Sequence, residues 1–241
     1  MEQPMQSLSA AQILALWETG RPQHALDRAL TILLAATPDA SRAALADLPI
    51  GERDARLFEL RALVFGARAE GFAECPRCAE RVEFPLDTAT LEERAPSPPS
   101  YASTYYETQT NGTTIRFRLP TSRDLAQAVA APDHEDALRL LVQRCSEQED
   151  LPNEFIEVLS RAMLEAYPQA EIILRLTCPA CGHEWDLLFD IAEFFWREIS
   201  AQAQRLLREI DTLARAYGWT EREILSLPAQ RRQTYLEMLA A

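Results

Sequence analysis

Four of the five cysteines lie in two C-P-x-C motifs that are far apart in the chain, Cys75-Pro-Arg-Cys78 and Cys178-Pro-Ala-Cys181. Cysteine pairs at this spacing are typical zinc ligands, and two pairs supply the four sulfur atoms of a tetrahedral site. The sequence therefore predicts that Cys75, Cys78, Cys178 and Cys181 bind one Zn²⁺ ion. Because four thiolates leave no position for water, this metal is expected to be structural and not catalytic.

The segments around the two motifs form an internal pseudo-repeat. In each copy an alternating apolar and polar segment follows the second cysteine, and an aspartate, Asp87 or Asp190, lies nine residues after that cysteine. This pattern predicts a strand before and after each motif, so that the two halves form a zinc ribbon split by residues 79–177. Closing a loop of about 100 residues costs on the order of 4 kcal/mol. Structural zinc contributes roughly 10 to 16 kcal/mol, which outweighs that cost.

Two redox-active pairs and two disulfides are the alternative interpretations of the four cysteines. A redox C-P-x-C motif normally opens a helix that lowers the pKa of its first thiol, whereas both motifs here lead into predicted strands. His183 follows the second motif and is an alternative ligand, although four thiolates complete the shell without it. The small number of cysteines, mostly paired, favours a reducing compartment in which thiolates hold metal.

No residue pattern in the chain is typical of catalysis. The sequence contains no Gly-rich phosphate loop, no G-x-S-x-G and no histidine-rich metal motif. His24 and His134 fall on predicted helices without a partner motif, and Cys145 is expected to be a core residue of a helix. We therefore expect a protein that is not an enzyme.

The composition excludes further classes of protein. The formal net charge is −13, and all 24 basic residues are arginine. Such a charge opposes nucleic-acid binding, which depends on clustered cations. Residues 1–11 lack the features of a signal peptide, and no segment approaches the ~18 consecutive apolar residues of a membrane helix. We expect a cytoplasmic globular protein with neither nucleic acid nor membrane as a partner.

Apolar periodicity and capping residues predict mostly helices, with strands near the cysteines and around Asn111-Gly112. The predicted helices span residues 10–19, 22–34, 41–46, 52–65, 124–130, 134–145, 153–167, 191–217 and 229–239, with a short helix that starts at Thr220. The predicted strands span residues 82–86, 105–110, 113–119, 172–177 and 185–189, with a change of periodicity from Ala73. The proline-rich residues 95–100 are expected to form a linker or exposed loop.

These elements predict an α+β fold that is mostly helical, with a split four-cysteine zinc ribbon and a small β-hairpin. The expected segments are an N-terminal helical lobe (1–70), a first ribbon half (71–94), an inserted hairpin with acidic helices (95–171), a second ribbon half (172–190) and C-terminal helices (191–241). Residues 133–171 contain ten acidic residues and three arginines. This segment is either a solvated surface or a docking face for a basic partner.

Several stretches of the chain resemble a family found in phage and phage-tail-like gene clusters, the baseplate hub assembly proteins, or hub chaperones, of T-even-like phages. The stretches are residues 16–20 (LWETG), 28–30 (RAL), 50–54 (IGERD), 65–66 (FG), the two cysteine motifs, 216–225 (AYGWTEREIL) and 231–236 (RRQTYL). Similar proteins occur with extracellular contractile injection systems. The resemblance implies a protein that helps to build the baseplate beneath a contractile tail or becomes part of it, with baseplate or hub proteins as partners.

Two functional hypotheses follow. The first is a non-enzymatic, zinc-stabilised assembly factor or structural component of such a baseplate; the alternative is a zinc-ribbon adaptor in transcription or nucleic-acid processing, which the acidic composition disfavours. Within the first hypothesis, residues 191–239 are a candidate partner-binding element, because Phe194, Phe195, Trp196 and Ile199 form a broad apolar surface. The other interpretation is that these residues fill the core. The pair Arg231-Arg232 is expected to form ion pairs or a small binding patch.

Overall fold

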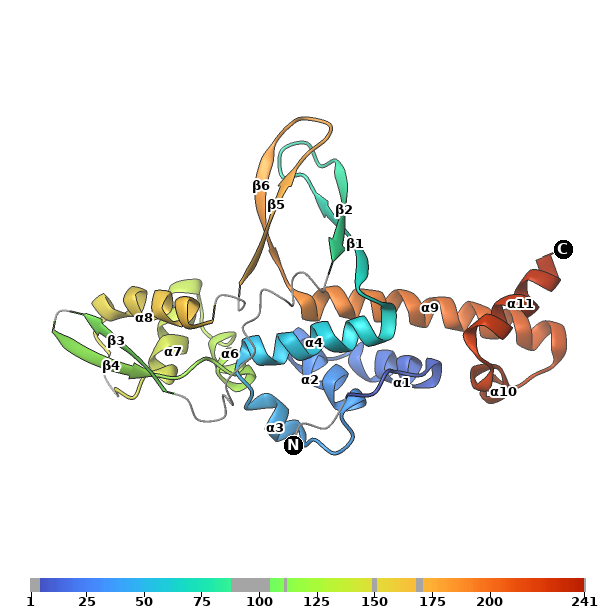
Figure 1. The fold of residues 1–241 in the computed structure, drawn as a ribbon, viewed down its shortest axis with the longest axis horizontal. Helices are drawn as coiled ribbons and strands as arrows, with labels where there is room; N and C mark the ends of the chain where they lie inside the picture. Colours follow the sequence, from blue (N-terminus) through green and yellow to red (C-terminus); the bar gives the residue numbers. More distant parts are fainter. Residues whose placement is uncertain (1–4, 88–104, 111, 149–150, 168–170, 241) are drawn as a thin grey trace.

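The protein is described here by a computed structural model that covers all residues except 1–4, 88–104, 111, 149–150, 168–170 and 241. The linker expected at residues 95–100 and the turn residue Asn111 lie outside the described residues. Figure 1 shows an elongated molecule with a central helical body, a pair of β-hairpins rising from it, and a further lobe at each end. The predicted class, mostly helical with small antiparallel hairpins, is confirmed.

The helical body consists of α1, α2, α3, α4 and α9, which share one hydrophobic core. Their bounds are Ala10–Gly20, Ala25–Ala36, Arg42–Ala46, Ile50–Phe65 and Ile191–Tyr217, respectively. The long helix α9 carries an apolar stripe along its length, and the N-terminal helices pack on the first half of that stripe. Residues from the two ends of the sequence therefore build one core.

Two β-hairpins rise from the body side by side, and we call them the stalk (Figure 1). The first pairs β1 (Arg68–Glu74) with β2 (Arg81–Asp87), and the second pairs β5 (Ile172–Thr177) with β6 (Glu184–Phe189). The strand β1 begins at Arg68, before the change of periodicity at Ala73 and inside the residues assigned to the N-terminal lobe. Gly71 interrupts the alternation of apolar and polar residues in β1, so the sequence did not reveal this part of the strand. Glycine is needed at this position because a Cβ there would lie 2.5 Å from the ring of Phe84 on the paired strand.

The segment between the two stalk hairpins forms an inserted lobe with a small core of its own. It contains β3 (Tyr106–Thr110), β4 (Thr113–Phe117), α6 (Ser122–Ala128), α7 (His134–Cys145) and α8 (Asn153–Ala166). The predicted hairpin is confirmed, with Gly112 at φ +76°. Ile115 and Phe117 of β4 pack beneath α7 and α8, so the hairpin covers one side of a helix pair.

Beyond the body, α9 continues to a C-terminal module of α10 (Glu221–Ser226) and α11 (Ala229–Ala240), both packed on α9. Gly218 ends α9 in the left-handed conformation at φ +69°, as predicted. Thr220 and Glu223 form a capping box at the start of α10. The predicted starts of α1 at Ser9 and of α6 at Thr121 are also confirmed by capping interactions.

The start of the second helix differs from the prediction. Pro22 lies in a turn, and α2 begins at Ala25 because the Nδ1 atom of His24 accepts a hydrogen bond from the Leu26 N–H group. His24 is therefore a helix cap and not a residue of the helix interior. Neutral histidine serves as a cap because one ring nitrogen carries a free lone pair.

Three of the four α9 residues that were candidates for partner contact instead fill the core, and the fourth, Phe194, is partly buried and packs against it. Phe195 and Ile199 are fully buried, and Trp196 is 7 % exposed. The Trp196 ring packs so closely on Gly20 of α1 that a Cβ there would lie 2.6 Å from it, and the Arg28 guanidinium lies 4.9 Å from the ring centre. The apolar surface of α9 is broad because it contacts α1, α2 and α4 at once.

Candidate metal centre

The two C-P-x-C motifs form the turns at the tip of the stalk, one in each hairpin. In the first turn the Cys75 N–H group donates to the Glu80 carbonyl oxygen at 2.9 Å, and the Ala79 N–H group donates to the Cys75 carbonyl oxygen at 2.9 Å. In the second turn Cys178 donates to His183 at 2.8 Å, and Gly182 donates to Cys178 at 2.9 Å, through the same main-chain atoms. The pseudo-repeat of the sequence is therefore one turn structure built twice.

This turn requires a left-handed residue directly after its second cysteine. Gly182 adopts φ +68°, and Ala79, at the equivalent position, adopts φ +60°. Glycine takes this conformation without steric cost, whereas alanine does not. The alanine therefore strains the first turn, and the four-sulfur cluster is built from one relaxed and one strained half.

The four cysteine sulfur atoms meet between the two turns, all within 4.8 Å of one another. The Sγ atoms of Cys75 and Cys181 are 3.7 Å apart, and those of Cys78 and Cys178 are 3.6 Å apart. A disulfide would require about 2.05 Å. In a tetrahedral site with Zn–S bonds of about 2.3 Å, neighbouring sulfur atoms lie about 3.8 Å apart. The cluster therefore has the dimensions of a four-thiolate metal site.

The surroundings of the cluster differ from one sulfur to the next. Cys75 and Cys178 are buried, Cys181 is half-buried and Cys78 is exposed. Burial raises the pKa of Cys75, but hydrogen bonds from the backbone of Arg77 and Cys78 and from nearby thiols outweigh it and lower the pKa to about 7. A backbone hydrogen bond at Glu80 lowers the pKa of Cys78, but the neighbouring thiols and burial outweigh it and raise the pKa to about 12. A bound cation would favour the thiolate form at every position.

Side chains next to the cluster support the turns and do not join it. Among the described residues, the four cysteine sulfur atoms form the group that could hold a metal ion, and His183 is not part of this group. The His183 ring instead stacks on Trp185, with ring centres 6.2 Å apart and an interplanar angle of 7°. Val82 and Trp185 pack against the cysteines in a small hydrophobic cluster at the tip. This packing shields the inner sulfur atoms from water.

Cys145, the fifth cysteine, is separate from the four-cysteine cluster. It is 1 % exposed in the core of the inserted lobe, as the sequence predicts for a helix residue. Burial and the Asp124 carboxylate raise the pKa of Cys145 to about 12. A thiol that keeps its proton at neutral pH is a poor nucleophile, so its environment favours a packing role.

A buried arginine at the base of the stalk was not identified from the sequence. Arg61 of α4 is 1 % exposed and donates to Glu198 of α9 at 2.7 and 2.9 Å, and to the carbonyl oxygens of Gly66 and Arg68 at 2.6 and 3.1 Å. Arg61 therefore joins the end of α4, the start of β1 and the first third of α9. No pattern in the sequence distinguishes Arg61 from the exposed arginines of other helices.

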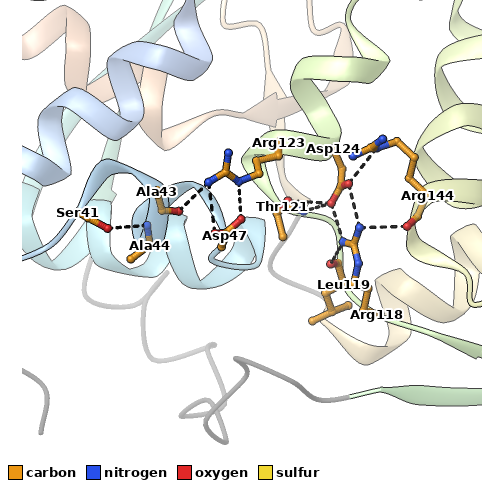
Figure 2. A network of polar contacts seen from close by, with 10 residues as sticks. All are labelled: Ser41, Ala43, Ala44, Asp47, Arg118, Leu119, Thr121, Arg123, Asp124 and Arg144. Atoms are coloured by element: carbon orange, nitrogen blue, oxygen red, sulfur yellow. Dashed lines mark hydrogen bonds and ion pairs between the residues drawn. The ribbon is translucent and has the colours of Figure 1, made fainter.

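A second polar network fixes the inserted lobe (Figure 2). The Asp124 carboxylate, which is 1 % exposed, accepts hydrogen bonds from Arg118 at 2.6 and 3.0 Å, from Arg144 at 3.1 Å and from Thr121. Arg123 on the same helix pairs with Asp47 at the end of α3. The first set of contacts holds the lobe together, and the second attaches it to the body. The Thr121–Asp124 cap was visible in the sequence, whereas the two arginines around Asp124 were not.

A family model from the comparison with known protein families matches most of the chain. The family model described as "T4 bacteriophage base plate protein" matches residues 7–196. The chain belongs to this T4 base plate protein family. No curated protein and no solved structure matches the chain.

The matched part of this base plate family member contains the N-terminal helices, the stalk, the inserted lobe and the first turns of α9. All four clustered cysteines lie within it. The rest of α9 and the C-terminal module follow the matched region. Within the described residues, no helix is both long enough and apolar enough to span a membrane.

Proposed function

We propose that this base plate family member is a non-enzymatic assembly factor or structural component of the baseplate of a contractile phage tail or a phage-tail-like injection system. The observation that carries the proposal is the family match over residues 7–196. Its partners are baseplate or hub proteins, and it acts in the cytoplasm, where it is either incorporated into the particle or released after assembly. A hub chaperone is the narrower form of this role.

The proposed contribution of the cysteines is structural. One Zn²⁺ ion held by Cys75, Cys78, Cys178 and Cys181 ties the two stalk hairpins together, because each short sulfur contact joins one hairpin to the other. The all-sulfur donor set and the near-tetrahedral spacing suit zinc. A complete thiolate shell leaves no open position for substrate or water, which supports the non-enzymatic assignment.

The zinc assignment is tested by elemental analysis of protein purified from the cytoplasm under reducing conditions. We expect close to one zinc per chain, and a Cys178→Ser variant should lose most of it. An iron content near one per chain, or metal-free protein with two intact disulfides, would contradict the assignment.

The baseplate role is tested by deleting the gene in a producing strain and isolating the tail assemblies. We expect tails without complete baseplates, restored by the wild-type gene. An affinity-tagged chain should co-purify with baseplate or hub proteins, and its presence in finished particles would distinguish a permanent component from a transient chaperone. Normal tails in the deletion strain, with the tagged chain bound to transcription proteins, would favour the zinc-ribbon adaptor instead.

A further inference from the structure

A groove lies between the two hairpins of the stalk and the start of α9. It has a volume of about 410 Å³ and is lined by residues 71–74 of β1, Phe84 of β2, residues 187–189 of β6, and Asp190 with the first turns of α9. Side chains of a strand alternate between its two faces. Four consecutive residues of β1 and three of β6 line the groove, which indicates that strand edges border it and not a single face of either hairpin.

The register shows which main-chain groups point away from each hairpin. The hydrogen bond from Cys75 to Glu80 makes these residues a hydrogen-bonded pair, and such pairs alternate along an antiparallel ladder. The N–H and C=O groups of Glu70, Phe72 and Glu74 therefore point outward from β1. The bond from Cys178 to His183 gives the same result on β6 for Glu184, Asp186 and Leu188.

Two independent observations support this assignment of the outward main-chain groups. The Arg68 carbonyl oxygen, which the same alternation directs outward, accepts a hydrogen bond from Arg61 at 3.1 Å. Pro85, which lacks an N–H group, pairs with Glu70 and so occupies an outward position on β2. Proline is tolerated in a sheet at such edge positions and blocks further pairing there. The outer edge of β2 is therefore closed, whereas the corresponding residues of β1 and β6 include no proline.

Apolar side chains lie beside these edges. Phe72 is 48 % exposed and Leu188 is 63 % exposed, and both line the groove. The exposed neighbours of Leu188 include its cross-strand partner Ile173, which is 56 % exposed. An added strand would cover some of this apolar surface while its main chain pairs with the edge.

The charge along the edges selects the partner. Of the seven residues of β1 and β6 with outward main-chain groups, Glu70, Glu74, Glu184 and Asp186 are acidic, and Arg68 at the start of β1 is basic. Asp186 already pairs with Arg175 at 3.1 Å. Asp190 and Glu193 add carboxylates at the end of the groove, where Arg197 pairs with Glu193 at 3.1 Å. A second copy of this chain would bring like charges together, whereas a segment with basic side chains would be attracted.

We infer that this groove binds an extended segment of a partner protein in which apolar and basic residues alternate, and that the segment pairs as a β-strand with the exposed edge of β1 or β6. The inference does not rest on the baseplate role, because any partner with such a segment would bind in this way. It assigns to the stalk a binding function in addition to its thiolate cluster.

The test measures backbone amide exchange in the full-length protein with zinc present. The probe is a peptide of about ten residues in which valine and arginine alternate. Because main-chain hydrogen bonds supply much of the affinity in strand addition, a peptide with the right alternation is sufficient. We expect exchange at Phe72 and Glu74, or at Asp186 and Leu188, to slow by at least about tenfold. A peptide with the same residues in one valine block and one arginine block controls for charge and should have little effect.

Proline variants give a second, independent readout. Leu188→Pro and Phe72→Pro each remove an outward N–H group without removing a ladder hydrogen bond, and we expect the variant on the pairing edge to weaken peptide binding by at least about tenfold. Ile173→Pro is the matched control, since Ile173 is the cross-strand partner of Leu188 and its N–H group points from the opposite edge. This control should bind the peptide like the wild type.

Three results would overturn the inference. They are equal effects of the alternating and block peptides, unchanged exchange at all four outward amides, and a dimer in sedimentation that already protects these amides without peptide. The exchange measurement on the wild type remains decisive if a proline variant fails to fold. None of these results bears on the family membership or the zinc content, so failure here and failure of the proposed function are distinguishable.

Discussion

Ala79 occupies a backbone conformation that suits glycine better. A non-glycine residue in the left-handed region costs roughly 1 to 2 kcal/mol, part of which is offset by the greater freedom of glycine in the unfolded chain. We expect Ala79→Gly to raise the free energy of unfolding by about 0.5 to 1 kcal/mol, measured by urea titration at a fixed excess of zinc.

The reverse substitution in the other hairpin is the matched control. Gly182→Ala should lower the free energy of unfolding by about 1 kcal/mol, because φ is +68° there. A Cβ at Gly182 would meet no other atom within 4 Å, so the loss would come from the backbone and not from a clash. If both variants have the stability of the wild type, the two turns do not differ in strain.

Asp124 is the centre of the network that holds the inserted lobe. Its carboxylate is buried and accepts hydrogen bonds from Arg118, Arg144 and Thr121. We expect Asp124→Asn to lower the free energy of unfolding by about 2 kcal/mol, because it leaves arginine charges without their anion; their partial exposure limits the loss. Asp47→Asn is the control. It should have little effect, since Asp47 and its partner Arg123 are both more than half exposed.

The contribution of Asp124 to the free energy of unfolding should also depend on pH. Burial raises the pKa of Asp124, but hydrogen bonds from Arg118 and Thr121 outweigh it and lower the pKa from 3.8 to about 2. The ionised carboxylate therefore stabilises the fold above about pH 4, and this contribution is lost as the pH falls toward 2. The difference in unfolding free energy between the wild type and Asp124→Asn should narrow over this interval. A constant difference would show that the charge of Asp124 is not its source.

At the scale of helices and strands, most elements were predictable because local residues determine them. Ser9, Thr121, Thr220 and Gly218 act as caps through atoms only a few residues away. The predicted start of an element was wrong where a distant residue or an uncommon capping residue determines it. The strand β1 contains a glycine that packs on Phe84 of β2, and α2 is capped by a histidine, which is less common as a cap than serine or aspartate.

The helix α11 is attached to α9 by a buried ion pair. Arg232 is 4 % exposed and donates to Glu209 of α9 at 3.1 Å and to the Leu227 carbonyl oxygen at 2.7 Å. We expect Arg232→Ala to destabilise this attachment by about 2 kcal/mol, because it removes the charged hydrogen bond to Glu209 and the bond to the Leu227 carbonyl oxygen. Arg205 still pairs with Glu209 at 3.1 Å, which limits the loss. Limited digestion with chymotrypsin should then release the C-terminal segment faster.

The adjacent Arg231 provides the control for this change. Arg231 is exposed on the same helix, so Arg231→Ala removes the same charge without removing the contact with Glu209. Its digestion rate should match that of the wild type. Equal acceleration in both variants would indicate an effect of net charge and not of the buried pair.

At the scale of the whole molecule, the sequence predicted which cysteines come together but not the arrangement of the parts around them. The spacing of the cysteines was sufficient to group Cys75, Cys78, Cys178 and Cys181, because the chemistry of thiolates limits the alternatives. The position of the stalk on the body depends on contacts such as Arg61 with Glu198, which are 137 residues apart in the sequence. The groove between β1 and β6 could not be predicted either. The sequence of a strand does not show which of its two edges remains unpaired in the fold.

The four-cysteine cluster and the helical core are separate in the structure, and the proposed zinc site therefore predicts what metal removal does. The hydrophobic cluster at the tip contains Cys75, Val82 and Cys178 with the partly buried Cys181 and Trp185, whereas the core of the body is formed mainly by helices. An isolated two-stranded hairpin is marginally stable in water. Treatment with a strong chelator under reducing conditions should therefore unfold the upper stalk and leave the helical body folded.

Amide exchange and circular dichroism together show whether the stalk unfolds while the helical body stays folded. After chelation we expect much faster exchange in β2 and β5, near-native exchange in the buried helices α2 and α9, and little change in the helical dichroism signal. Cys178→Ser should produce the same pattern without chelator, and added zinc should restore the chelated wild type but not the variant. Loss of the helical signal on chelation would show that the metal holds the whole fold, and unchanged exchange in both hairpins would show that it does not stabilise the stalk.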